Sequence, residues 1–81
     1  MTLGERVKQR RERRNWSQGH LARLTGLDQG ILSRIESGEV RNPGINSLIA
    51  LARALECSID YLVDLYNEDQ MDSSAMASVS A

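Results

Sequence analysis

Two short segments of the chain open with a capping residue followed by a glutamine, and these residue types suit hydrogen-bonded recognition of a ligand. Gln18 follows Ser17, and Gln29 follows Asp28. Ser and Asp are preferred immediately before a helix, and the free backbone N–H groups of a helix start can bind a phosphate. The Gln29 amide has the donor and the acceptor needed to bond both N6 and N7 of an adenine. Considered alone, the same two glutamines are also explained as solvated polar residues, so the rest of the chain must decide whether they bind a ligand.

Catalysis and metal binding are not indicated. The one histidine, His20, and the one cysteine, Cys57, are not spaced as a catalytic dyad or as a metal-ligand set. We therefore expect no enzyme activity and no cofactor. No apolar run approaches the ~18 residues needed to cross a membrane, and the N-terminus lacks the apolar region of a signal peptide. We expect a single soluble, cytoplasmic domain without membrane contact, as the length of 81 residues allows.

The charges are separated along the sequence. Residues 1–45 contain nine Lys or Arg and five Asp or Glu, a net charge of +4, whereas residues 46–81 contain one Arg and six acids, a net charge of −5. The overall charge of −1 thus hides a basic half that can attract nucleic acid. Considered alone, the basic run is explained about as well by a solvated helix face.

Caps and apolar spacing predict five helices and no strand, which is an all-α fold. The first helix starts at Thr2, which forms a capping-box pattern with Glu5. Only Gly26, Leu27 and Asp28 separate the second helix from the third, and so short a connection makes the two helices cross steeply, as in a helix-turn-helix. The predicted helices span residues 2–14, 17–26, 28–38, 45–55 and 58–65.

The fourth predicted helix is almost wholly apolar, and we expect it to be the central buried helix. Leu27 is expected to fill the space under the turn between the second and third helices. The other apolar residues expected to face the core are Leu3, Val7, Leu21, Ala22, Leu24, Ile31, Leu32, Ile35, Ile45, Leu48, Ile49, Leu51, Ala52, Leu55, Tyr61, Leu62 and Leu65.

With these motifs the chain resembles the DNA-binding domain of the phage repressor and Cro proteins, the Xre-like helix-turn-helix family, over residues 3–65. The resemblance rests on the order and spacing of LGERVKQRRERRNWSQ, HLARLTGLDQGILSRIESGEVRNP and INSLIALARALECSIDYL. It implies a five-helix, lambda-repressor-like domain that binds double-stranded DNA sequence-specifically. It also implies a homodimer on a palindromic operator, with the third helix in the major groove. A transcriptional regulator, and more specifically a repressor, is the expected function.

The resemblance implies base contacts from the exposed side of the third helix. Gln29 is expected to read an adenine, Ser33 to reach a base or a phosphate, and Arg34 to serve the DNA backbone or a guanine. Gly30 departs from the family, in which a longer residue at this position often reads a base. The glycine either leaves specificity to its neighbours and to DNA shape or lets the backbone approach the DNA more closely. Neutral drift at a surface position is the alternative.

Phosphate contacts are expected from the helix starts, from the loop after the third helix and from the first helix. Gln18 is also expected to brace Gln29, and Arg11 and Glu36 to form a partly buried ion pair that sets the third helix. Ordinary solvation is the alternative for the polar surface residues. The residues expected to contact phosphates are Ser17, Gln18, Asp28, Arg41, Asn42, Arg10 and Arg14.

The domain is expected to cover residues 1–66 and to be followed by a flexible acidic tail rich in Ser and Ala, residues 67–81. This tail keeps a second class of function open, in which an antitoxin-like regulator binds a partner protein through its C-terminal segment. A flexible end without a partner is the simpler interpretation of the same residues. Deleting the tail distinguishes these alternatives, because only an antitoxin-like regulator would lose a partner protein while it keeps its DNA binding.

Overall fold

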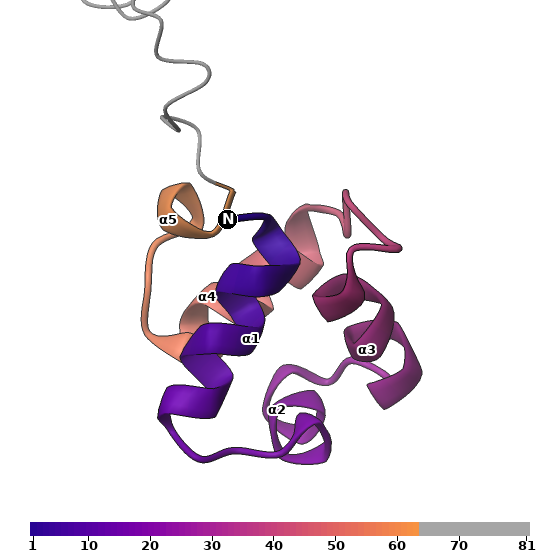
Figure 1. The fold of residues 1–81 in the computed structure, drawn as a ribbon, viewed down its shortest axis with the longest axis vertical. Coiled ribbons are helices and arrows are strands. Elements are labelled where there is room, and N and C mark those ends of the chain that lie inside the picture. The colour runs from indigo at the N-terminus through magenta and orange to yellow at the C-terminus, as the bar shows by residue number, and fades with distance from the viewer. Residues whose placement is uncertain (64–81) are drawn as a thin grey trace, which may run out of the picture.

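The computed structural model describes residues 1–63, which form five helices and contain no strand. Figure 1 shows α1 crossing the middle of the domain, with α3 and α5 on either side of it. The predicted all-α, five-helix architecture is confirmed. The end of the predicted domain at residue 66, the tail 67–81 and Leu65 lie outside the described residues. The helices are α1 (Leu3–Arg13), α2 (Gln18–Thr25), α3 (Gln29–Ser37), α4 (Ile45–Leu55) and α5 (Ile59–Val63).

The predicted caps set the helix starts. Thr2 Oγ1 accepts from Glu5 N at 3.1 Å, and Thr2 N donates to Glu5 Oε1 at 2.8 Å, so both halves of the capping box are present. The bond from Thr2 N lowers the pKa of the Glu5 carboxyl, so this cap weakens as the pH falls through that pKa. Ser17, Asp28 and Ser58 each accept a backbone N–H from their own helix at 3.0 Å.

The turn between α2 and α3 has the predicted helix-turn-helix form. Gly26 ends α2 in the left-handed conformation, with φ of 77°, which glycine adopts without strain. Leu27 is half-buried and packs on the core beneath the turn. Asp28 then caps α3. With only these residues between them, the two helices run in different directions (Figure 1).

The core is built from one face of each helix, and three predicted core residues are exposed instead. Leu24, Ile31 and Ile45 expose 52%, 42% and 60% of their surface. At 3.6 residues per turn, Leu24 and Ile31 lie about 90° to 110° around their helices from the buried faces. Ile45 lies in the first turn of α4, and only the later part of that helix contributes fully buried residues, so α4 is not buried throughout. The buried apolar residues are Val7, Leu21, Ala22, Leu32, Ile35, Leu51, Ala52, Leu55 and Leu62.

A glycine in α1 sets how closely α1 and α3 approach, and the sequence analysis did not single it out. Gly4 is buried, and a Cβ on it would lie 2.7 Å from the carbonyl oxygen of Glu36 and closer still to that of Ile35. Both obstacles are backbone atoms, which cannot rotate away as a side chain can. The available signal was that a glycine inside a helix costs about 1 kcal/mol relative to alanine and therefore needs a packing reason.

Candidate nucleic-acid interface

The polar side of α3 faces solvent. Gln29, Gly30, Ser33 and Arg34 are exposed, whereas the other side of the helix carries the buried Leu32 and Ile35. No other element of residues 1–63 covers this polar side, as the exposure of all four residues requires. The four residues predicted to read bases are therefore accessible together, on one helix that the core holds from behind.

Gly30 relieves crowding at the N-terminal cap of α3. Its N–H donates to Asp28 Oδ2 at 3.0 Å, and a Cβ on Gly30 would lie 3.0 Å from that same oxygen. Apart from its chain neighbours and the nearby backbone of α3, no other atom of the described residues would come within 4 Å of the Cβ. The Asp28 carboxylate thus serves as a cap, and its negative charge opposes a phosphate, so its position does not favour the phosphate contact predicted for Asp28.

We expect Gly30→Ala to stabilise the protein by up to about 1 kcal/mol. Alanine gains about 1 kcal/mol of helix propensity, and the exposed Asp28 side chain can move by the few tenths of an ångström that the new methyl group needs. Denaturant unfolding measures the change. Asp28→Ala serves as the comparison, because it removes the cap altogether and should cost about 1 kcal/mol. A comparable loss of stability for Gly30→Ala would mean that the methyl group breaks the cap.

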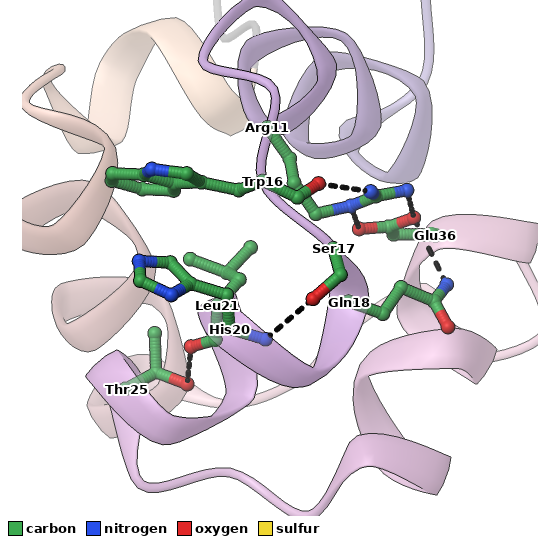
Figure 2. Close-up of polar contacts among 8 residues, drawn as sticks. All are labelled: Arg11, Trp16, Ser17, Gln18, His20, Leu21, Thr25 and Glu36. Carbon is green, nitrogen blue, oxygen red and sulfur yellow. Dashed lines mark hydrogen bonds and ion pairs between the residues drawn. The ribbon is translucent and has the colours of Figure 1, made fainter.

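A buried ion pair ties α1 to the end of α3, as predicted. Arg11 Nε lies 2.7 Å from Glu36 Oε2, and Arg11 Nη2 lies 2.9 Å from Glu36 Oε1 (Figure 2). The two residues expose only 8% and 7% of their surface. The third arginine nitrogen, Nη1, donates to the carbonyl of Trp16 at 2.7 Å. Hydrogen bonding to Glu36 raises the pKa of Arg11, so the guanidinium stays charged at every ordinary pH.

Gln18 binds Glu36 rather than Gln29, which corrects the predicted brace. Gln18 Nε2 donates to Glu36 Oε1 at 3.1 Å, so Glu36 also anchors the start of α2 (Figure 2). A buried carboxylate is a stronger acceptor than a neutral amide, which explains the choice of partner. Gln29 lies over α2 at Gly19 instead, where a Cβ would be 3.4 Å from Gln29 Oε1.

The start of α2 still has backbone donors that the helix itself does not satisfy. Ser17 Oγ accepts the N–H of His20 at 3.0 Å and keeps its own hydroxyl proton as a donor. The N–H groups of Gln18 and Gly19 lie in the first turn, where an α-helix offers no internal acceptor. Ser17 is exposed. This helix end can therefore accept an oxyanion through hydrogen bonds, as the sequence suggested.

The loop after α3 contributes exposed polar residues. Arg41 and Asn42 are both exposed and follow the left-handed Gly38 that ends the helix. Beside Arg41 lies an open hollow of about 300 Å³, whose apolar lining includes Pro43, Ile45 and Val63. The loop thus joins the polar side of α3 to an apolar depression.

The side chains of Arg10 and Arg14 do not lie next to the polar side of α3. Arg10 is stacked over the ring of Tyr61 in α5, 4.8 Å from its centroid. Arg14 lies 5.4 Å from the ring centroid of Trp16 and pairs with Glu56 at 3.1 Å. Both guanidinium groups therefore point toward the α4–α5 side of α1 and away from α3. These positions do not favour the phosphate contacts predicted for Arg10 and Arg14.

The fold and this exposed helix pair define a helix-turn-helix protein. Residues 7–62 match the family described as Helix-turn-helix, and the chain belongs to that family. The predicted resemblance to phage repressor proteins is confirmed by a relative, Repressor protein C2 of Salmonella phage P22. The two are 38% identical over 61 residues, which cover 75% of this chain and 28% of that protein.

A second relative is the HTH-type transcriptional regulator SinR of Bacillus subtilis, 33% identical over 70 residues, which cover 86% of this chain and 63% of SinR. The chain thus spans less than two thirds of either relative. Two solved structures are similar. The P22 c2 repressor in complex with a synthetic operator has a TM-score of 0.73 at 33% identity, covering 78% of this chain and 94% of that one. SinR in complex with DNA has a TM-score of 0.72 at 33% identity, covering 75% of this chain and 97% of that one.

Proposed function

We propose that this protein is a transcriptional regulator, and specifically a repressor, that binds double-stranded DNA sequence-specifically with α3 in the major groove. The observation that carries the proposal is the exposure of Gln29, Ser33 and Arg34 together on one side of a helix that the core and the Arg11–Glu36 pair hold from behind. The similarity to two structures that contain DNA supports the same conclusion.

Within α3, the roles follow from side-chain chemistry. Gln29, at the start of the helix, bonds an adenine through its amide, and Arg34 bonds a phosphate or a guanine. Ser33 lies one turn beyond Gln29 and reaches a base or a phosphate. Gly30 contributes no side chain, so its neighbours and DNA shape carry more of the specificity.

Phosphates are bound on either side of α3. The Ser17 hydroxyl and the N–H of Gln18 bind one strand through the start of α2. Arg41 and Asn42 bind the backbone from the loop after α3. These groups fix the position of α3 on the duplex but do not read the sequence.

A homodimer on a palindrome is part of the proposal. The apolar hollow next to Arg41, together with Ile45 at 60% exposure, offers a second copy a surface adjacent to the DNA-binding loop. Two α3 helices would then lie about 34 Å apart, one turn of DNA. Sedimentation with and without Ile45→Glu tests this, since the variant should remain monomeric if the copies meet here.

Selection of bound sites from random duplexes tests the function as a whole. We expect an enriched motif with two-fold symmetry, which would give specificity, symmetry and half-site spacing together. Retention that is uniform across all sequences would contradict sequence-specific binding. The alternative protein-binding role depends on residues 67–81, outside the described residues, and stays a prediction.

Gln29→Ala should relax the preference at one base position of each half-site by about 1 to 3 kcal/mol, because a bidentate contact to one base is lost. Repeating the selection with the variant measures this. Gln29 does not support the core, so stability should hardly change. Recovery of the original motif by the variant would show that Gln29 does not read a base.

Arg41→Ala should weaken binding to all sequences alike and lower the salt slope of the binding constant by about one unit per subunit, because one phosphate contact disappears. Binding titrations over a range of salt concentrations measure the slope. Arg53→Ala is the matched control, since Arg53 is exposed on α4 but lies outside the proposed interface. Equal salt slopes for Arg41→Ala and the unaltered protein would show that Arg41 does not contact a phosphate of the DNA.

A further inference from the structure

Three polar side chains meet around Gly19, in the first turn of α2. A Cβ on Gly19 would lie 3.4 Å from Gln29 Oε1. The same Cβ would lie 3.8 Å from both Arg23 Nη1 and Ser17 Oγ. Because glycine has no side chain, these groups can approach the bare backbone at this position. Ser17 and Gln29 belong to the proposed DNA interface, whereas Arg23 has no role in it so far.

The guanidinium of Arg23 is turned back toward the start of α2. Arg23 belongs to the last turn of this helix, but its Nη1 lies beside the first turn, at Gly19. Helical side chains lean toward the N-terminus, so residues four positions apart meet on one face. This conformation brings a full positive charge close to the backbone N–H groups that α2 leaves without an internal acceptor.

The charge of Arg23 is not neutralised within residues 1–63. Arg23 is exposed, and none of the ion pairs or side-chain hydrogen bonds of these residues involves its guanidinium. The first turn of α2 contains no acidic residue. A cation beside the positive end of a helix is unfavourable unless an anion joins it. The guanidinium and the helix start therefore favour an oxyanion at the same place.

Arg23 and Ser17 can bond one anion together. The Ser17 hydroxyl accepts the N–H of His20 and keeps its own proton as a donor. Ser17 Oγ and Arg23 Nη1 both lie 3.8 Å from one point, the Cβ position of Gly19. A phosphate offers a separate oxygen to each donor, at about 2.9 Å per hydrogen bond. No side chain of Gly19 stands between the two donors, so a single phosphate can bridge them.

We propose that Arg23 binds the same DNA phosphate as the Ser17 hydroxyl, across the bare backbone of Gly19. This inference rests on the proposed function and adds a residue to its interface. The contact supplies the start of α2 with a charged anchor, where the other donors are neutral. Gln29 Oε1 lies at the same glycine, so the anchored phosphate also fixes how Gln29 meets the base edges.

Binding titrations over a range of salt concentrations test the charge of Arg23 on the site selected from random duplexes. Arg23→Ala should lower the salt slope by about 0.9 units per subunit, because one phosphate is no longer neutralised. Arg23→Lys should keep the slope, and so should the matched control Arg53→Ala, which removes an exposed arginine of α4. The motif selected by Arg23→Ala should be unchanged, since a phosphate contact does not read sequence. An unchanged slope, or a motif altered at one base position, would overturn the proposal.

Duplexes in which one phosphate at a time is replaced by an uncharged methylphosphonate locate the contact. The replacement at the shared phosphate should weaken binding of the unaltered protein. This sensitivity should be lost in Arg23→Ala and reduced in Ser17→Gly at the same position of the duplex. Glycine is used at residue 17 because it preserves most of the stability that an N-cap provides. Effects of the two variants at different phosphates would show that Arg23 and Ser17 do not share one.

Failure of this inference can be distinguished from failure of the proposed function. If the unaltered protein selects no sequence, the proposed function is wrong, and the role of Arg23 is wrong with it. If the protein selects a site and Arg23→Ala binds that site with the same salt slope, only the role of Arg23 is wrong. The midpoint of denaturant unfolding should be the same for Arg23→Ala and the unaltered protein, because the side chain is exposed.

Discussion

Arg11→Ala should lower the free energy of unfolding by about 3 to 5 kcal/mol, because the Glu36 carboxylate would stay buried without its opposite charge. The loss extends beyond one contact. The guanidinium bonds both oxygens of Glu36 and the carbonyl of Trp16, so the variant also leaves a partly buried carbonyl without its donor. Denaturant unfolding monitored by circular dichroism measures the change.

Arg14→Ala is the matched control for this experiment. Arg14 also belongs to α1 and pairs with a glutamate, but 80% of the Glu56 side chain is exposed, so the pair is screened by water. Removal of such a surface pair should cost about 1 kcal/mol or less. Equal losses in the free energy of unfolding for Arg11→Ala and Arg14→Ala would show that burial does not increase the contribution of the Arg11–Glu36 pair to stability.

Gly4→Ala is expected to destabilise the protein by about 3 kcal/mol, at the upper end for adding a methyl group to a packed interior. The new Cβ would collide with the carbonyl oxygens of Ile35 and Glu36, which are fixed in the last turns of α3. The helices would have to separate, and this would strain the Arg11–Glu36 pair next to them. Thermal and denaturant unfolding measure the effect.

Gly19→Ala provides the comparison for Gly4→Ala. Gly19 is also a helical glycine, but the nearest atom to a Cβ there is Gln29 Oε1 at 3.4 Å, an ordinary contact with an exposed side chain. We expect this variant to be stabilised by about 0.5 to 1 kcal/mol through helix propensity. A gain in both variants would mean that α1 and α3 can move apart without cost.

The sequence predicted best those features that depend on residues close together in the chain. The caps at Thr2, Ser17 and Asp28 each use a side chain and a backbone group two or three residues away, so a short motif contains the whole interaction. The helix ends predicted at Gly26 and Gly38 are local in the same sense, because a single glycine in the left-handed conformation ends each helix. The Arg11–Glu36 pair spans 25 residues and was predicted only through the family resemblance.

The features that the sequence did not predict depend on tertiary packing. Gln18 was predicted to brace Gln29, whereas packing places the buried Glu36 carboxylate within hydrogen-bond distance of its amide. The stacking of Arg10 on Tyr61 could not be predicted from the sequence, because the two residues are 51 positions apart and only the packing of α5 on α1 brings them together. Gly4 lies between the two capping-box residues of α1, where nothing in the local sequence requires a glycine. The requirement arises because the backbone of α3 packs against it.

The exposed side of α3 is separable from the part of the helix that maintains the fold. Leu32, Ile35 and Glu36 hold the helix through the core and the ion pair, whereas residues 29, 30, 33 and 34 are exposed. Side chains at these four positions can therefore be exchanged without disturbing the core, so proteins that share this scaffold can present different surfaces on α3.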